Sequence, residues 1–361
     1  MALITTYGDG PGELGGHAQA ADQQIRLEAE LPNGRVLIGD VDTLTGHASG
    51  GDDDLVAFGF SSLVLGDARL ITDHARGGDD EVWAGGLVGA SAIGDALTLS
   101  GHAWGGNDSV TASAGFGATA GGFGDALTMG DHVHGGNDTL TGFTEHGETR
   151  LYGDAHTMVG FARGGDDVLG STDSVDFLYG DADSMGDHAR GGADTLIGQG
   201  THAINHLYGD ARVLQGYSIG GNDVLIAQGQ VELSVSPALT WLYGDGEALL
   251  DRSQGGNDTL FSGANTAELM WGDAATVAPT ATTGADLFVF APQNGHDEIM
   301  DFQPGKDRIE LNGLVSGGLE ALATRFVATL DGVLISFDAN DDILLRGITV
   351  AQFSPSDFIF G

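Results

Sequence analysis

The chain has 361 residues, of which 62 are glycine and none is cysteine. The absence of cysteine excludes disulfides as a source of stability, and the glycine content indicates many turns. Asp and Glu number 52 against 13 Lys and Arg, so the formal net charge is −39. This charge argues against nucleic acid and anionic membranes as partners and favours cations.

The acidic composition does not indicate disorder, because 41% of the residues are apolar and they recur at fixed positions. The segment from Met1 to Gly10 has neither a basic n-region nor an apolar h-region, and no apolar run of 18 residues occurs. The sequence therefore predicts no cleaved amino-terminal signal and no membrane-spanning helix. Export would need another signal.

Residues 1–36 are the first predicted element, an amino-terminal cap or a degenerate first coil of the repeats that follow. Asp9 and Asp22 lie 13 residues apart, which is the spacing of those repeats. The glycines and the following aliphatic residue of the repeats are missing here.

Residues 37–283 contain a repeat built from two aspartate steps. The first step is Gly-Asp, and its first-series aspartates are Asp40, Asp67, Asp95, Asp125, Asp154, Asp181, Asp210, Asp245 and Asp273. The second step is Gly-Gly-x-Asp, and its second-series aspartates are Asp53, Asp80, Asp108, Asp138, Asp167, Asp194, Asp223 and Asp258. Each pair is separated by 13 residues, and Asp273 with Asp286 keeps this spacing although that motif reads Thr-Gly-Ala-Asp.

The other half of each period varies from 14 to 22 residues. Tolerance of insertion is typical of surface loops, so we expect loops on one side of the molecule. The candidates are Ser109 to Gly122, His146 to Arg150, Gly200 to His206 and Gln228 to Thr240.

Apolar residues follow the same frame. Two residues after the second-series aspartates stand Leu55, Val82, Val110, Leu140, Leu169, Leu196, Leu225, Leu260 and, after Asp286, Phe288. Four residues after the first-series aspartates stand Leu44, Ile71, Leu99, Met129, Met158, Met185, Leu214, Leu249 and Val277. One coil cannot bury such faces alone, but coils stacked about 4.8 Å apart can. The pattern predicts an all-β, right-handed parallel β-solenoid of about nine coils of 27 to 35 residues.

Stacked coils would bring like charges to within about 5 Å of each other, which costs about 0.8 kcal/mol per neighbour in water and more at lower dielectric. A divalent cation removes this repulsion, and an all-oxygen site without cysteine favours Ca²⁺. The alternative is that each step is an ordinary turn whose carboxylate accepts backbone N–H groups. Asparagine would serve such a turn equally well, yet it never replaces a second-series aspartate, although it occurs one residue earlier at Asn107, Asn137, Asn222 and Asn257.

The segment Gly-Gly-Asn-Asp-Thr-Leu-Thr-Gly from Gly135 to Gly142, and a similar one from Gly255, resemble the RTX (repeats-in-toxin) calcium-binding nonapeptide. The resemblance implies that the aspartate carboxylates and turn carbonyls bind multiple Ca²⁺ ions between coils of a parallel β-roll. The Gly-Asp-Ala step, as at Gly153 to Ala155, departs from the nonapeptide. The longer period implies a wider coil.

Residues 284–361 look like the carboxy-terminal domain found after RTX repeats in secreted bacterial proteins. The similarity rests on Asp297, Ile299, Asp301 and Phe302, followed by Gly305, Asp307 and Ile309. It implies a capping and secretion-signal domain, metal roles for Asp297 and Asp301, and export by a type I secretion system that reads an uncleaved signal near Ser354 to Gly361. Such a chain would fold outside the cell, where calcium is plentiful.

Two further columns precede the Gly-Gly steps. One contains His47, His74, His102, His132, Phe161, His188, Tyr217 and Arg252, and it predicts either a stacked ring ladder or a transition-metal site. The column before it alternates as Gly46, Asp73, Gly101, Asp131, Gly160, Asp187, Gly216 and Asp251. Turn geometry and additional metal ligands on alternate coils are the two interpretations of this alternation.

No catalytic motif for a metalloprotease, a serine hydrolase, a phosphate loop or a dinucleotide site occurs in the sequence. The main hypothesis is therefore a secreted calcium-binding module without catalytic residues, structural or adhesive, whose partners are calcium, the type I secretion machinery and a cell-surface or extracellular polymer. The rival hypothesis is a secreted hydrolase or carbohydrate-active enzyme. Its catalytic residues would sit in the long loops, and clustering of Arg150, His202, His206 and Glu232 in one cleft would favour it, whereas a featureless rod with a filled core would favour the module.

Overall fold

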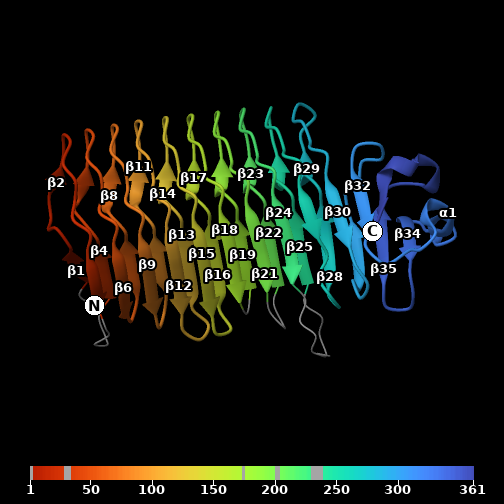
Figure 1. The fold of residues 1–361 in the computed structure, drawn as a ribbon, viewed down its shortest axis with the longest axis horizontal. Helices are drawn as coiled ribbons and strands as arrows, with labels where there is room; N and C mark the ends of the chain where they lie inside the picture. Colours follow the sequence, from red (N-terminus) through yellow and green to blue (C-terminus); the bar gives the residue numbers. More distant parts are fainter. Residues whose placement is uncertain (1–2, 28–33, 173–174, 200–203, 229–238) are drawn as a thin grey trace.

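A computed structural model describes residues 3–27, 34–172, 175–199, 204–228 and 239–361. The chain winds through three parallel sheets, and each coil contributes one strand to each sheet (Figure 1). We call them the first, second and third sheets, in the order in which a coil passes through them. No helix within the described ranges is both long enough and apolar enough to cross a membrane.

The three sheets contain 14, 10 and 12 strands. The first sheet has the order β1 (Leu3–Tyr7), β4 (Gly34–Ile38), β7 (Ser62–Leu65), β10 (Ala90–Ile93), β13 (Thr119–Phe123), β16 (Glu148–Tyr152), β19 (Val175–Tyr179), β22 (Ile204–Tyr208), β25 (Leu239–Tyr243), β28 (Ala267–Trp271), β31 (His296–Ile299), β35 (Asp342–Arg346), β34 (Gly332–Ser336) and β33 (Phe326–Ala328). The second has β2 (Glu13–Leu14), β5 (Thr43–Leu44), β8 (Ala68–Ile71), β11 (Ala96–Leu99), β14 (Ala126–Met129), β17 (Ala155–Met158), β20 (Ala182–Met185), β23 (Ala211–Leu214), β26 (Gly246–Leu249) and β29 (Ala274–Val277). The third has β3 (Gln24–Leu27), β6 (Asp54–Gly59), β9 (Glu81–Gly86), β12 (Ser109–Ala114), β15 (Thr139–Thr144), β18 (Val168–Thr172), β21 (Thr195–Gln199), β24 (Val224–Gln228), β27 (Thr259–Phe261), β30 (Leu287–Phe290), β32 (Arg308–Leu311) and β36 (Phe358–Phe360).

The predicted parallel β-solenoid is confirmed. In the described part of the chain, the strands from β4 to β30 make nine three-stranded coils, and β1, β2 and β3 make one more. Equivalent residues pair in register from coil to coil, as Val110 pairs with Val82 on one side and Leu140 on the other. The period of 27 to 35 residues is therefore the length of one coil.

The coil formed by β1, β2 and β3 has its own register. Asp9 donates its backbone N–H to the carbonyl of Asp40, so it lies level with the first series. Gln24 pairs with Asp54, which places Gln23 level with Asp53 and Asp22 level with Asp52. The 13-residue spacing of Asp9 and Asp22 therefore does not put Asp22 in the second series, because this coil holds one residue more between the two positions.

Two of the four expected loops are mostly strand. Within the range 109–122, β12 and β13 leave only residues 115–118 outside the sheets, and β16 begins at Glu148. The added residues lengthen strands that pair in register with their neighbours, which satisfies their backbone hydrogen bonds. The loops predicted at 200–206 and 228–240 lie largely outside the described residues, apart from the adjoining ends of β22, β24 and β25.

Two apolar cores run along the solenoid. The column from Leu55 to Phe288 is at most 1% exposed and lies between the first and third sheets. The column from Leu44 to Leu249 is fully buried in a second core behind the second sheet. Val277 is the exception, at 40% exposure. It was expected in this column, but β29 is the last strand of the second sheet and no further coil covers it.

A third apolar cluster occupies the opposite face of the first sheet. Its members precede the Gly-Asp steps, and successive rings stack at centroid distances of 4.5 to 4.9 Å. This aromatic file consists of Phe123, Tyr152, Tyr179, Tyr208, Tyr243 and Trp271. Leu97 and Leu127 of the second sheet pack against the cluster.

The carboxy-terminal part covers the end of the solenoid. β35 joins the first sheet in parallel with β31, and β34 and β33 then continue it as antiparallel strands. β36 closes the third sheet against β32, and the short helix α1 (Gly318–Ala323) packs Leu322 into the core. Two 3-10 turns, Val350–Gln352 and Pro355–Asp357, precede β36.

Candidate metal centre

The first-series aspartates, from Asp40 to Asp273, are at most 1% exposed and form a first carboxylate ladder inside the solenoid. Each accepts a hydrogen bond from a glycine 11 residues later, which is the second glycine of its own coil's Gly-Gly step or, for Asp273, Gly284 of the Thr-Gly step. Gly106 N–H donates to Asp95 Oδ1 at 3.0 Å, and Gly136 N–H donates to Asp125 Oδ1 at 2.9 Å. Because this bond spans most of the segment between the first-series and second-series aspartates of a coil, it explains why that segment has a fixed length.

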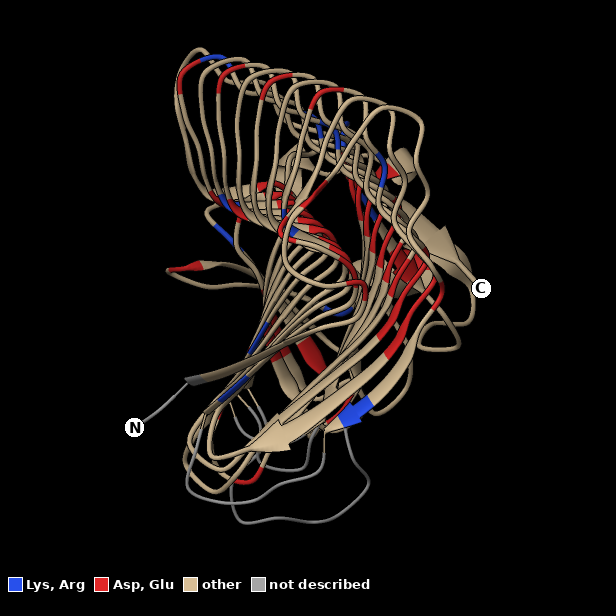
Figure 2. Ribbon diagram, turned by 90° about the vertical axis from the view of Figure 1, so that its left-hand side faces the viewer, with Lys and Arg blue, Asp and Glu red and all other residues tan. Residues whose placement is uncertain are grey.

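The second-series aspartates, from Asp53 to Asp286, form a second carboxylate ladder and are at most 3% exposed. Each Oδ1 accepts the backbone N–H of the equivalent residue in the preceding coil. Asp108 N–H donates to Asp138 Oδ1 at 2.7 Å, and Asp138 N–H donates to Asp167 Oδ1 at 2.7 Å. The ladder therefore links the coils as well as closing turns. Figure 2 shows the acidic residues recurring in files from coil to coil.

The other oxygen, Oδ2, has no hydrogen-bond partner among the described residues in any of the nine members of the second ladder. It faces acceptors. A Cβ built on Gly39 would collide with both Asp53 Oδ2 and the carbonyl oxygen of Gly66, and a Cβ on Gly66 would collide with Asp80 Oδ2 and the carbonyl of Gly94. A buried carboxylate oxygen beside carbonyl oxygens requires a proton or a cation between them.

Burial is the main cause of raised pKa values along both ladders. It raises the pKa of Asp53 to about 8, with the charge of Asp40 adding to the effect. In the first ladder, burial raises the pKa of Asp125 and of Asp181 to about 6. Neighbouring carboxyls of this ladder also hydrogen-bond each other, as Asp67 does with Asp95. These aspartates cannot all be bare anions at neutral pH.

The donor set fits calcium. Ca²⁺ takes six to eight oxygen ligands, including carboxylates and backbone carbonyls, whereas zinc and copper prefer nitrogen or sulfur. Within the described ranges no three Asp, Glu, His or Cys side chains converge on one point. An ion between the ladders would therefore draw on carbonyls such as that of Gly66 together with a carboxylate oxygen such as Asp53 Oδ2.

The residues immediately before the second-series aspartates form an exposed file on the outer side of the same turns. This exposed file explains why asparagine is tolerated at that position. Asn137 N–H donates to Asn107 Oδ1, and Asp166 N–H donates to Asn137 Oδ1, each at 2.9 Å. Asparagine supplies the accepting side-chain oxygen in this exposed file as well as aspartate does, and Ala193 at the same position supplies none. The second ladder differs because its second oxygen is buried among acceptors.

The carboxy-terminal end of the ladders contains the chain's only lysine, Lys306. Asp286 N–H donates to Asp307 Oδ1 at 3.2 Å, so Asp307 continues the second ladder. Asp301 accepts the backbone N–H groups of Gly272 and Asp273 at 2.8 and 3.1 Å, which places it beside the first ladder. Burial raises the pKa of Asp273 to about 6, and the Lys306 ammonium opposes that rise. Neither Asp307 nor Lys306 has a repeated counterpart that would mark it in the sequence.

Asp297 joins neither ladder. It pairs with Glu268, a residue that the repeat pattern does not single out, near the outer end of the first core. Among the predicted metal residues it is the one that the structure places apart.

The histidine column is a stacked ladder. His47, His74 and His102 stack face to face at centroid distances of 5.0 to 5.1 Å, and His17 extends the stack. The stack continues through His132, Phe161, His188 and Tyr217. Parallel rings at this spacing keep equivalent nitrogens too far apart to share a zinc ion at about 2.0 to 2.1 Å. This geometry favours the ring-ladder interpretation over the transition-metal one.

The alternating column is explained by turn geometry. Gly46, Gly101, Asp73 and Asp131 all have φ between 59° and 75°. Each aspartate also accepts the backbone N–H of the glycine in the coil before it, as Asp73 Oδ2 does from Gly46 at 3.3 Å. Aspartate on alternate coils caps every second turn without stacking like charges.

Of the four residues whose clustering would favour the rival enzyme hypothesis, His202 and Glu232 lie outside the described residues. Arg150 and His206 lie in one file on the face of the first sheet that carries the aromatic file, separated by Phe177. The Arg150 guanidinium is 5.7 Å from the Phe177 ring centroid, and the His206 ring stacks on Phe177 at 4.8 Å. Burial lowers the pKa of His206 to about 4. These contacts are those of side chains stacked in a row on a sheet, not of residues that meet in a cleft.

Three parallel sheets, two buried carboxylate ladders and glycine turns define a repeat protein of the RTX type. A family model described as "Peptidase M10 serralysin C terminal" matches residues 82–360. The chain belongs to this family, which is the RTX-type repeat region of serralysin-like proteases and their non-catalytic carboxy-terminal part. No curated protein and no solved structure matches the chain.

Proposed function

We propose that this protein is an extracellular module whose solenoid folds on binding multiple Ca²⁺ ions between the two carboxylate ladders. The observation that carries the proposal is the buried Oδ2 of every second-ladder aspartate, which lies beside carbonyl oxygens and lacks a hydrogen-bond donor within the described residues. The RTX-type repeats of the family typically bind Ca²⁺, which supports calcium as the ion.

Under this proposal the ligands come from both ladders. The first would contribute Asp40, Asp67, Asp95, Asp125, Asp154, Asp181, Asp210, Asp245 and Asp273, and the second would contribute Asp53, Asp80, Asp108, Asp138, Asp167, Asp194, Asp223, Asp258 and Asp286, with Asp301 at the end. When bound, calcium supplies the positive charge that these buried oxygens lack. The position of Lys306 also supports the proposal, because its ammonium group places a positive charge near Asp273, the last member of the first ladder.

The free energy of calcium binding then contributes directly to the stability of the folded chain. A chain without metal must either protonate its buried carboxyls or leave them repelling each other, so ions that bind only the folded state shift the equilibrium towards folding. Dissociation constants of about 10⁻⁴ to 10⁻³ M suffice for an extracellular module. The chain would cross a calcium-poor cytoplasm poorly folded, leave by type I secretion through a signal near Ser354 to Gly361, and fold outside.

The role outside the cell would be structural or adhesive, with a cell-surface or extracellular polymer as the partner. This role needs no catalytic residue, and the family's non-catalytic character supports it. Stacked aromatic and histidine files along the solenoid suit a rigid scaffold better than a reaction cleft.

The test is a calcium titration of the full chain followed by far-ultraviolet circular dichroism. We expect a largely disordered spectrum in chelator and a cooperative gain of β structure as calcium rises. Magnesium is the control, because it has the same charge but dehydrates reluctantly and demands near-ideal octahedral geometry. A spectrum that is equally folded in excess chelator would contradict the proposal.

A further inference from the structure

Polar residues form a third buried file at the outer end of the first core, away from both ladders. Strand pairing aligns Thr149, Asn205, Thr240, Glu268 and Asp297 along successive coils of the first sheet, with Asp176 between the first two. All are at most 2% exposed. Three of its six members are acidic, and two of these, Glu268 and Asp297, lie on the adjacent strands β28 and β31.

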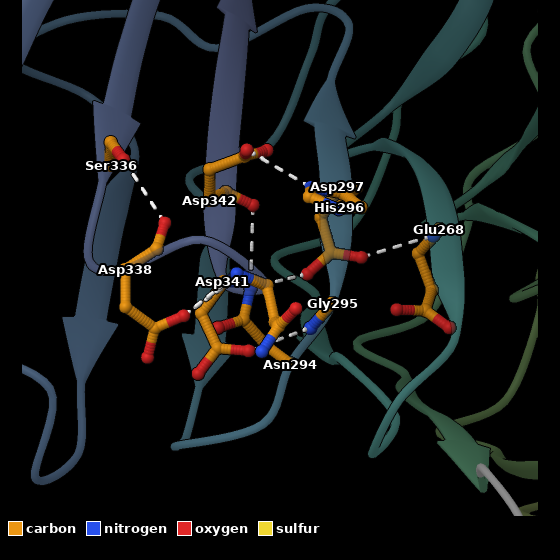
Figure 3. A network of polar contacts seen from close by, with 10 residues as sticks. Glu268, Asn294, Gly295, His296, Asp297, Ser336, Asp338, Asp341 and Asp342 are labelled. Atoms are coloured by element: carbon orange, nitrogen blue, oxygen red, sulfur yellow. Dashed lines mark hydrogen bonds and ion pairs between the residues drawn. The ribbon is translucent and has the colours of Figure 1, made fainter. Parts of the chain in front are cut away.

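The carboxyls of Glu268 and Asp297 interact, and Figure 3 shows Asp297 in contact with both Asn294 and Glu268. Asp297 Oδ1 accepts the backbone N–H of Glu268 at 3.0 Å, and its Oδ2 accepts the Asn294 amide at 2.8 Å. The Ser262 hydroxyl lies 3.0 Å from Asp297 Oδ2 and 3.3 Å from Glu268 Oε2. The Ser262 hydroxyl therefore links the two buried carboxyls, and the Asn294 amide adjoins Asp297.

Two oxygens of this cluster have no donor. Glu268 Oε1 and Asn294 Oδ1 are buried without a hydrogen-bond partner among the described residues, and those side chains are 0% and 2% exposed. No ion pair within the described ranges includes Glu268 or Asp297. Burial, the nearby Asp297 charge and the carboxyl-carboxyl contact raise the pKa of Glu268 well above its usual range.

We propose that Glu268, Asp297 and Asn294 bind one Ca²⁺ ion at the junction between the solenoid and the carboxy-terminal cap. The donor set consists of oxygens alone, with two carboxylates and an amide carbonyl, which suits calcium. The site extends the proposed calcium dependence to a third location, but its ligands belong to neither ladder.

The position of the cluster indicates what such an ion does. Asn294 Nδ2 also reaches the carbonyl of Asp342 in β35 at 3.4 Å. Asp341, just before β35, accepts the backbone N–H groups of Gln293 and Gly295 at 2.8 and 3.4 Å. An ion held by Glu268 and Asp297 would fix the 293–295 turn and, through it, the cap strand β35. The site therefore joins the cap to the last coil.

The test compares the number of calcium ions per chain in the wild type and in Glu268→Gln, by elemental analysis after exchange into a defined calcium buffer. Glutamine keeps the shape of the side chain and removes its charge. We expect one ion fewer per chain in Glu268→Gln, with a folded circular dichroism spectrum in saturating calcium. Glu247→Gln on β26, with a half-exposed side chain, is the matched control and should keep the wild-type number.

A second variant keeps the test decisive if Glu268→Gln folds poorly. Asn294→Asp adds a carboxylate, so a calcium site should bind its ion more tightly and the calcium-saturated cap should melt at a higher temperature. If Glu268 and Asp297 merely share a proton, the charge added by Asn294→Asp would instead destabilise the protein and leave the number of bound ions as in the wild type. This result would overturn the proposal.

The outcomes also separate this site from the ladders. If the wild type binds several ions and Glu268→Gln binds the same number, the junction site is wrong and the ladder proposal stands. If the wild type binds no calcium, both are wrong. If the wild type binds one ion that Glu268→Gln loses, the junction site stands and the ladders do not bind calcium.

Discussion

Aspartate and asparagine differ in one atom, and the second ladder depends on that atom. Oδ1 does what either residue could do, because it accepts a backbone N–H from the preceding coil. Oδ2 lies among acceptors, where a carboxylate can hold a cation between itself and a carbonyl oxygen. In the exposed file one residue earlier no second oxygen is buried among acceptors, and both aspartate and asparagine occur there.

We expect Asp138→Asn to lower the free energy of unfolding in saturating calcium by about 2 to 4 kcal/mol, because it removes one ligand from a buried charged site. Without calcium the same change removes a buried negative charge and should be neutral or stabilising. Urea unfolding in calcium and in chelator measures both effects.

The matched control for Asp138→Asn is Asp166→Asn, which makes the same chemical change in the exposed file of the next coil. Asp166 needs only one oxygen, to accept the Ala193 N–H at 2.9 Å. Its effect should stay within about 0.5 kcal/mol in either buffer. An Asp138→Asn variant with the same loss in chelator as in calcium would show that the carboxylate has only a hydrogen-bonding role.

At the scale of the element, the turn between the first and second sheets requires glycine because the next coil approaches its Cα closely. The Gly-Asp glycines have ordinary backbone angles, so the restriction is one of space. We expect Gly66→Ala to destabilise the calcium-bound protein by at least about 2 kcal/mol, through its collision with the Gly94 carbonyl and Asp80 Oδ2. Thermal unfolding monitored by circular dichroism checks this value.

Gly170 in β18 provides the control for that change. A Cβ there meets no atom of the described residues within 4 Å, so Gly170→Ala should be neutral or slightly stabilising. Equal losses in the two variants would mean that the Gly-Asp turn has no special spatial constraint.

The strands also show what sequence periodicity can predict. Positions occupied by the same residue type in every coil were predictable, including both ladders and the columns that contain Leu55 and Leu44. The polar file was not, because four residue types share this one position: its members are Thr149, Asp176, Asn205, Thr240, Glu268 and Asp297. Val277 and Asp22 were misplaced for a related reason: periodicity does not indicate where a sheet ends or where the register slips by one residue.

At the scale of the whole molecule, the two ladders give the protein an unusual dependence on pH. Burial raises the pKa of Asp125 and Asp181 to about 6, and that of Asp53 and Asp286 to about 8, from an ordinary value of 3.8. Between about pH 4 and pH 8 the metal-free folded chain therefore binds more protons than the unfolded chain. Its stability must fall as pH rises through this window.

Calcium should reverse that slope, because the ion requires deprotonated carboxylates. We expect the metal-free protein to be more stable at pH 5 than at pH 8, and the calcium-saturated protein to be more stable at pH 8. Urea unfolding at both pH values, in resin-stripped and calcium-containing buffers, measures the two slopes. A metal-free protein that gains stability from pH 5 to pH 8 would show that the buried carboxyls do not control folding.

The hydrogen bonds of the second ladder all point the same way along the solenoid, so the two ends of this rod differ. Each coil gives its amide to a carboxylate of the coil that follows it in the sequence. A rod cut in mid-solenoid would thus present hydrated negative charges on one cut surface and unsatisfied amides on the other. Charges deter edge-to-edge aggregation, whereas open amides invite it. At the amide end of this rod Asp307 accepts the last N–H of the ladder, from Asp286, and β35, β34 and β33 extend the first sheet, so the cap removes part of the surface that would invite uncontrolled polymerisation.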